Sequence, residues 1–447
     1  MQSQKRASAN RAPDTDDMVS ARPDAATVET EPPRRAPRLA ARIPTSLRPL
    51  VRTGRFTATK LLAAAAQRAF EHCPGSSETF GPPRHFAPTL KGYAREHAGD
   101  IDYIEIYGAH EVSRHLPISL PSAMAGDNRI PPEFLAEQRM PMPAAGVAII
   151  PNGRVLTTQG SIIAPPDTFI ADVSDAWTAG NQIARKIFLS PRLPQVTRRD
   201  ETVAVLTTHC SPFNYGHWMC DTIPRLHLLA QSGIAYDRIV VPDSFQYHRE
   251  TLALIGVPRE RMITARDQQI EARHLVVPTF PGVYGEPPAW ACRYLRERFL
   301  GFARPGPRRR VLVSRNKPGA VRRILNEDAL FAALEPFGFE RIFPEDLSFP
   351  DEISLFHNAE IVIGALGAGM MNTMWCQRGT AIIELFNPRY ISLMTWVIAN
   401  HLGLRYACAL GGAAAIRPLA RDDRGIYDDV EADIDEIFRL FLIMCAP

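Results

Sequence analysis

One short segment, Asn214 to Leu226, gathers a histidine, a tryptophan, an aspartate and an arginine directly after a strand-like apolar run. If a helix begins at Gly216, His217 and Asp221 lie four residues apart and share one face. A carboxylate beside an imidazole orients the ring and raises its basicity, as a general base requires. A strand–helix junction with a buried Trp218 and a hydrogen-bonded histidine is the alternative reading of the same residues.

Pro224 limits how this helix can continue, because its ring would clash with the carbonyl of Cys220. We therefore expect either a kink there or a new helix starting near Thr222. The histidines and cysteines of this region match no standard zinc spacing, so no metal site is predicted; they are His209, Cys210, His217 and Cys220.

A second candidate site is a glycine-rich turn that follows the apolar strand at Ile361 to Gly364. The turn, Gly367-Ala368-Gly369, runs toward Asn372, and glycines there let a ligand approach the backbone of a following helix. The spacing is GxxGxG rather than the GxGxxG dinucleotide fingerprint, so an NAD(P)-dependent oxidoreductase is only an alternative. A tight strand–helix turn without a ligand would also explain these glycines.

Two arginines and one glutamate complete the set of candidate ligand contacts. Arg315 ends the strand predicted over 310–314, where parallel α/β sheets bind ligands, and Arg322 could reach the same crevice. Guanidinium groups suit a diphosphate because they are forked and stay charged. Glu384 ends an apolar strand and could accept ribose hydroxyls. Solvated surface arginines and a salt-bridged glutamate are the structural alternatives.

The elements that must position these residues alternate between strand and helix after residue 200. Strands are predicted over 203–206, 238–241, 274–277, 310–314, 361–364, 381–386 and 405–409, and helices over 246–255, 289–302, 327–337, 391–402 and within 430–444. Such alternation is typical of parallel sheets covered by helices. A Pro-Gly linker at 303–307 divides the pattern, so we expect two Rossmann-like domains facing a cleft.

The expected domain organisation has four parts. Residues 1–45 lack periodic apolar positions and are predicted to be a disordered tail. Residues 46–100 form a helical extension with one helix over 53–71, residues 101–303 the first Rossmann-like domain, beginning with strands over 101–107, 146–150 and 154–158, and residues 308–447 the second.

Charge and composition exclude several classes of protein. The 447 residues carry 51 basic and 48 acidic side chains, so no field for binding nucleic acid is expected. No secretory signal or spanning apolar stretch is visible, and the seven cysteines lack disulfide-like spacing. We therefore expect a cytoplasmic protein.

Taken in order, these motifs resemble glycosyltransferase family 61, the family of capsular-polysaccharide-type enzymes. The resemblance covers roughly residues 200–390 and rests on the following positions: Asn214, His217, Trp218, Asp221, Pro224-Arg225-Leu226, Ser314-Arg315, Arg322, Asn326-Glu327, Leu347-Ser348-Phe349, Gly367-Ala368-Gly369, Asn372 and Ile383-Glu384. Members look like GT-B enzymes, with the acceptor mostly on the first domain and the nucleotide-sugar on the second.

The resemblance implies roles for these residues. His217, with Asp221, would be the base, and Asn214, Trp218 and Arg225 would line the acceptor side. Arg315, Arg322, Gly367, Ala368, Gly369, Asn372 and Glu384 would bind the donor. An inverting displacement from a nucleotide-sugar, with a UDP-sugar favoured, to a glycan or lipid-linked acceptor is expected, without an essential metal. The resemblance leaves peripheral association with the inner face of the membrane open.

One position departs from the family pattern. A histidine usually precedes the GAG turn, and here that residue is Leu366. A polar contact to phosphate or sugar would then be missing. A catalytically silent relative that binds glycan or scaffolds polysaccharide assembly is therefore the rival to an active transferase.

Overall fold

A computed structural model describes residues 65, 68–120, 130–174, 186–266, 268–413 and 425–445. The predicted tail, residues 1–45, lies outside the described residues, as does most of the helix expected over 53–71. The described residues of that span, Ala65 and 68–71, are helical. Residues 57–447 form one compact unit.

The first sheet has ten strands and mixed directions. Its parallel part runs in the order β12-β9-β10-β11, and antiparallel strands flank β12 on its other side. The parallel strands are β9 (Val196–Val205), β10 (Arg238–Val241), β11 (Met262–Thr264) and β12 (Gln269–Pro278). The others are β1 (His85–Ala87), β2 (Asp102–Tyr107), β5 (Ala145–Pro151), β6 (Arg154–Leu156), β7 (Ser161–Ala164) and β8 (Thr168–Ile170). The expected parallel arrangement therefore holds for only part of this sheet.

The helices that follow this sheet's parallel strands carry the first candidate segment. They are α6 (Tyr215–His217), its π-helical continuation η5 (Trp218–Thr222), α7 (Arg225–Ser232), α8 (Gln246–Ile255) and α9 (Ala289–Phe299) with the turn η7 (Leu300–Phe302). Further short elements are α2 (Leu90–Glu96), α3 (Pro132–Ala136), α4 (Ala171–Ser174), α5 (Lys186–Leu189), η6 (Arg259–Arg261) and the antiparallel pair β3 (His110–Ser113)–β4 (Arg139–Met142). A strand and a helix, β1 and α2, thus lie in the extension that we expected to be helical.

The second sheet has five parallel strands in the order β14-β13-β15-β16-β17. They are β13 (Arg309–Val313), β14 (Phe339–Ile342), β15 (Ala359–Ala365), β16 (Ala381–Phe386) and β17 (Arg405–Leu410). All six residues of β16 are buried, as expected for a central strand that helices cover on both faces. This arrangement is compatible with a Rossmann-like α/β fold.

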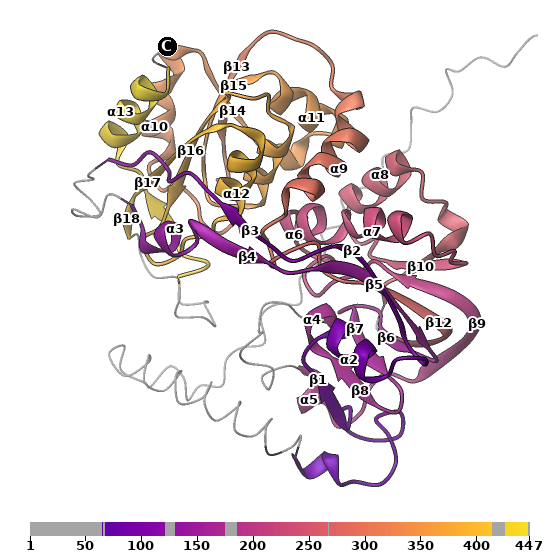
Figure 1. Ribbon diagram of the computed structural model, residues 1–447. Helices are drawn as coiled ribbons and strands as arrows, with labels where there is room; N and C mark the ends of the chain where they lie inside the picture. The colour runs from indigo at the N-terminus through magenta and orange to yellow at the C-terminus, as the bar shows by residue number, and fades with distance from the viewer. Residues whose placement is uncertain are drawn as a thin grey trace, which may run out of the picture. The chain divides into compact units, whose positions relative to one another are not determined.

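Helices cover both faces of the second sheet (Figure 1). On one face α10 (Glu327–Leu334) and α13 (Ile434–Cys445) pack over Ile361 and Ile363 of β15. On the other, α11 (Phe349–His357) and α12 (Met394–Leu402) pack over Val362. The remaining elements are η8 (Glu335–Phe337), η9 (Pro344–Asp346), η10 (Ala368–Trp375) and the pair β18 (Gly412–Ala413)–β19 (Val430–Glu431).

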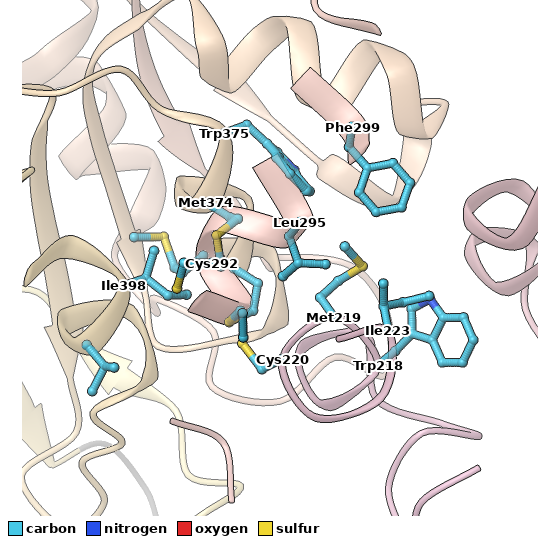
Figure 2. Packing of buried hydrophobic residues seen from close by; sticks show 14 of the residues in the cluster. Trp218, Met219, Cys220, Ile223, Cys292, Leu295, Phe299, Met374, Trp375 and Ile398 are labelled. Atoms are coloured by element: carbon cyan, nitrogen blue, oxygen red, sulfur yellow. The ribbon is translucent and has the colours of Figure 1, made fainter. Parts of the chain in front are cut away.

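One apolar cluster connects the two sheets. It includes Val276 of β12 and Val362 of β15, and between them the helical segments of both halves interdigitate. Figure 2 shows Trp218, Met219 and Ile223 of the first half near Leu295 of α9 and Met374 of η10. The first candidate segment is therefore built into the packing between the sheets, and its position depends on both of them.

Candidate active site

His217 and Asp221 form a buried hydrogen-bonded pair. His217 Nδ1 and Asp221 Oδ2 are 2.7 Å apart, and both residues are buried. An ionised carboxylate only accepts, so Nδ1 carries the proton and Nε2 keeps its lone pair. Among the described residues, no hydrogen-bond partner is found for Nε2, and it is not a buried unpaired atom. The ring is thus arranged to accept a proton from a ligand.

A new helix does begin next to Pro224, but at Arg225 rather than near Thr222 as predicted. The side chain of Asn214 accepts from His217 N at 3.3 Å and caps a helix that begins at Tyr215. The chain then widens into the π-helical turn η5, and a new helix begins at Arg225, with Pro224 before it. The wider turn still brings residues 217 and 221 together.

A loop after β12 holds the pair from the other side. Gly285 donates its backbone N–H to Asp221 Oδ1 at 2.9 Å, and the Tyr284 ring stacks on His217 with centroids 4.2 Å apart. Gly285 has φ +78°, a conformation that favours glycine. Both carboxylate oxygens of Asp221 are therefore engaged, which fixes the orientation of the imidazole.

Two residues predicted to line the acceptor side are buried in the core instead. Trp218 is fully buried, and its indole N–H donates to Thr251 Oγ1 at 2.9 Å. Arg225 is also fully buried and donates to the carbonyls of Leu206, Thr207 and Pro278. Burial lowers the pKa of Arg225 to about 9. Neither side chain reaches an acceptor in this conformation, because packing and hydrogen bonds inside the fold occupy both of them.

A pocket of about 340 Å³ lies at the carboxyl ends of β13 and β15. That is within the usual size range for small-molecule sites and is where parallel sheets bind ligands. From the second half it is lined by Val313, Ser314, Arg315, Ala320, Pro344, Glu345, Glu352, Ala365, Ala368, Gly369, Met370 and Asn372; from the first half by Tyr215 and Tyr247. The pocket therefore combines several predicted donor residues with residues of α6 and α8.

Arg315 lies directly against the glycine turn. A Cβ built on Gly367 would overlap the Arg315 guanidinium, so any larger residue there would displace this side chain from its present position. Arg315 lines the pocket, and its Nε donates to the Val321 carbonyl at 3.1 Å, which leaves its terminal nitrogens without a hydrogen-bond partner among the described residues. Burial, with Arg322 nearby, lowers the pKa of Arg315 to about 10. A buried cation of this kind favours binding of an anion.

Arg322 lies in a different cavity from Arg315. It lines a small cavity with Leu366, Asn387 and Tyr390, and its Nη1 donates to the Ile426 carbonyl at 3.1 Å. Its Nε is buried without a hydrogen-bond partner in the described residues, and its φ of +57° is unusual for a residue with a side chain. The structure therefore does not bring both arginines into one pocket.

Glu384 does not line either cavity. It is fully buried in β16, where Oε1 accepts from Thr395 Oγ1 at 3.0 Å and Oε2 from Tyr406 Oη at 2.6 Å. Burial raises its pKa to about 7, partly offset by those two hydrogen bonds. In this structure the glutamate is a core residue with both oxygens already engaged, an arrangement that does not favour the predicted contact with ribose.

Asn372, which lines the pocket, connects the two halves of the molecule. Its Oδ1 accepts from Tyr215 Oη at 2.7 Å and from Trp375 Nε1 at 3.1 Å. Gly216 packs beside Met371 of η10, since a Cβ there would lie 3.1 Å from Met371 Cγ. His217 itself does not line the pocket, but Tyr215, two residues earlier in the same turn, does.

Sequence reasoning missed four residues of this region: Tyr215, Tyr284, Gly285 and Glu352. The loop at 284–285 had no local signal, because its partners lie more than sixty residues earlier in the chain. Glu352 did have one: Ser348, Pro350 and Asp351 together mark the start of a helix, and Ser348 caps α11.

In the part of the chain that the structure describes, no group of three or more His, Cys, Asp and Glu side chains is arranged to hold a metal ion. No helix within the described ranges has the length and apolar character needed to cross a bilayer.

The fold and the site define an α/β protein with a ligand pocket at the ends of parallel strands. Residues 215–383 match the family model described as Glycosyltransferase 61. Over 69 residues the chain is 35% identical to the EGF domain-specific O-linked N-acetylglucosamine transferase of Drosophila melanogaster; this alignment covers 15% of the chain and 13% of that relative. The resemblance to glycosyltransferase family 61 is therefore confirmed, and it rests on residues 215–383.

Proposed function

We propose that this protein is a glycosyltransferase that moves a sugar from a nucleotide-sugar to an acceptor hydroxyl. The observation that carries the proposal is the buried Arg315 guanidinium, held against Gly367 at the edge of a pocket at the carboxyl ends of β13 and β15. The family match over residues 215–383 supports the same conclusion.

In this proposal Arg315 binds the diphosphate of the donor. Arginine–phosphate contacts are charge-assisted and contribute more than neutral hydrogen bonds. The same contacts stabilise the charge that develops on the leaving diphosphate, which is where a transferase gains most of its rate. Arg322 is a second candidate, although in this structure it lines a separate cavity.

His217 is the proposed base for an inverting displacement. The acceptor oxygen forms a bond to the anomeric carbon, and the bond from that carbon to the diphosphate oxygen breaks with its electron pair leaving on the diphosphate. The hydroxyl proton passes to His217 Nε2, and Asp221 stabilises the imidazolium that results. Because His217 does not line the pocket, the acceptor must approach from the side of Tyr215 and Tyr284.

The broader assignment depends on the family resemblance and is part of the proposal. It includes a GT-B arrangement, a UDP-sugar donor, a glycan or lipid-linked acceptor, and a role in surface or capsular polysaccharide synthesis at the cytoplasmic face of the membrane. The printed name of the Drosophila relative adds support for a nucleotide-activated N-acetylglucosamine as a donor to test.

A donor screen tests the proposal. UDP-, GDP-, ADP- and CMP-sugars are each added to the protein, and thermal unfolding is followed, since a ligand that binds only the folded state raises the melting temperature. We expect one nucleotide class to stabilise the protein, and its sugar to be released or transferred on incubation. Stabilisation without any turnover would favour the silent relative suggested by Leu366. Absence of any nucleotide binding would refute the proposal.

A further inference from the structure

The loop at residues 283–286, which contacts the proposed base, is held by a buried ion pair. Its Gly285 donates to Asp221, and the next residue, Glu286, is 8% exposed. Oε2 of Glu286 lies 2.8 Å from Nη2 of Arg114, whose side chain is 1% exposed. The ion pair therefore acts one residue away from the backbone N–H that orients Asp221.

The segment that carries Arg114 is anchored in the second half of the molecule. It follows β3, and further along it Ile118 forms a parallel bridge with Ala407 of β17. The His115 carbonyl accepts a hydrogen bond from the indole N–H of Trp396 in α12 at 2.8 Å. The Arg114 guanidinium lies over the same indole, 5.4 Å from the ring centroid, where a cation is attracted to the π-face. Contacts with α12 and β17 thus fix the position of this arginine.

A second carboxyl group, that of Glu137, lies beside the ion pair. Its Oε2 is 3.6 Å from Arg114 Nη1, and its side chain hydrogen-bonds to Glu286. Burial and the neighbouring Glu286 hold the pKa of Glu137 above its usual range, and Arg114 offsets part of this rise. A neutral Glu137 can donate to Glu286, so the arginine faces one negative charge. A buried ion pair needs such additional hydrogen bonds to compensate for the loss of hydration.

The loop contacts the imidazole at the edge that carries the ring nitrogens. A Cβ built on Gly285 would lie 3.5 Å from Cε1 of His217, the ring carbon between the two nitrogens. The same Cβ would lie 3.1 Å from Cε of Met394, the first residue of α12. Gly285 therefore fits between the proposed base and the helix whose Trp396 contacts Arg114. A displacement of about 1 Å at such a position can lower a rate about 100-fold.

We propose that Arg114 is a positioning residue, which fixes the 283–286 loop through Glu286 and thereby orients His217 for proton transfer. This inference rests on the proposed function, because it concerns the base of that reaction. Arg114 lies before residues 215–383, which match the family model, and it does not line the proposed donor pocket. Its loss should therefore lower the rate of transfer without lowering the affinity for the donor.

The kinetic test compares Arg114→Met with wild type. Methionine keeps an unbranched apolar chain over Trp396 but removes the charge. We expect kcat at saturating donor to fall about ten- to a hundredfold, with the donor dissociation constant within about twofold of wild type by calorimetry. Arg114→Lys, which keeps the charge without the fork, should recover part of the lost rate. Arg139→Met is the matched control, since this arginine is exposed on β4 opposite Ser113, and it should keep the wild-type kcat.

Hydrogen exchange followed by mass spectrometry tests the structural step without requiring transfer. In Arg114→Met, a peptide spanning residues 282–287 should exchange faster than in wild type, whereas peptides of β12 should exchange at the wild-type rate. Glu286→Gln removes the negative charge and keeps the arginine, so it is the second variant if Arg114→Met does not fold. The double variant should have about the kcat of the slower single variant, because both substitutions remove the same ion pair.

The outcomes separate this inference from the proposed function. If wild type transfers sugar and Arg114→Met keeps the wild-type kcat or the wild-type loop exchange, the positioning role is wrong and the function stands. If Arg114→Met loses donor affinity together with rate, the arginine supports the fold as a whole, and the inference is equally wrong. If wild type transfers no sugar from any donor, both proposals fail, whereas faster loop exchange would still show that Arg114 holds the loop. Thermal melts of each variant confirm that it is folded before its rate is interpreted.

Discussion

The two regions proposed to act on substrate differ in how far their polar groups are satisfied. At the His217–Asp221 pair both carboxylate oxygens have partners, and a stacked tyrosine fixes the imidazole. In the pocket at the ends of β13 and β15, Arg315 donates only its Nε, to the Val321 carbonyl, and its terminal nitrogens have no hydrogen-bond partner among the described residues. The first region is organised in advance for a reaction, whereas the second is incomplete until a ligand binds. Hydrogen bonds that are already complete therefore mark the proposed catalytic pair, and unused hydrogen-bonding groups mark the proposed binding surface.

The largest expected effect is the loss of turnover in His217→Ala. Removing a general base lowers rates by about 10²- to 10⁴-fold. Asp221→Asn should have a similar effect, since the amide no longer selects the tautomer that leaves Nε2 unprotonated. The measurement is the rate of sugar transfer under saturating donor.

A control histidine makes that result specific. His227→Gln changes a half-buried histidine of α7 that stacks on Trp290, away from the pair, and should leave the rate of transfer within about twofold of wild type. If His217→Ala retained full turnover, another group would have to accept the proton of the acceptor hydroxyl. The His217–Asp221 pair would then not be the catalytic region.

A second prediction concerns the glycine that makes room for Arg315. In Gly367→Ala the new methyl group displaces the guanidinium, so nucleotide affinity should fall about tenfold, equivalent to about 1.4 kcal/mol. Gly301→Ala is the matched control, because a Cβ there meets nothing within 4 Å and φ is not positive. Calorimetry of both variants with the bare nucleoside diphosphate measures the difference. Equal affinities would mean that Arg315 does not hold the diphosphate.

The smallest expected effect concerns Glu384, the carboxyl that is buried in the core of the second half. The pKa of Glu384 is about 7 in the folded protein, against 4.5 for an unperturbed group. Between these values the folded state binds more protons than the unfolded chain, so wild-type stability falls as pH rises from about 4.5 to 7. In Glu384→Gln the amide does not titrate, so this loss of stability is absent. The free energy of unfolding of the variant, relative to wild type, should therefore rise by roughly 2 kcal/mol between pH 5 and pH 8.

Chemical denaturation at the two pH values measures this change, and nucleotide affinity should stay within about twofold of wild type. A large loss of affinity in Glu384→Gln would instead restore the ribose contact that the buried position of this residue argues against.

Much of the second sheet could be predicted from sequence because its strands are buried apolar runs. The bounds of β16 coincide with the predicted ones, as do those of β10 and α8 in the first half. The strand β14 was missed because it is four residues long and half charged, and α11 because its cap was not recognised. The mixed pairing around β12 could not be predicted, since it depends on contacts between strands more than one hundred residues apart.

The candidate site was predicted less completely, for a related reason. The types and spacing of His217 and Asp221 determine their pairing within one turn, so the sequence alone indicated it. Trp218 and Arg225 have equally suggestive chemistry, yet tertiary packing buries them. Glu384 was assigned to a ligand because it ends an apolar run, but its neighbours from α12 and β17 enclose it. Whether such a residue contacts a ligand or belongs to the core depends on its burial, and local sequence patterns do not predict burial.

In the proposed division of labour, the pocket at the ends of β13 and β15 binds the donor, and the His217–Asp221 pair performs the chemistry. Titration of wild type, Arg315→Ala and His217→Ala with the stabilising nucleotide-sugar tests it directly, with Arg308→Ala, an exposed arginine, as the control for lost charge. We predict that His217→Ala and Arg308→Ala bind like wild type, whereas Arg315→Ala binds about ten- to a hundredfold more weakly. Equal loss in His217→Ala and Arg315→Ala, or full affinity in Arg315→Ala, would contradict the division.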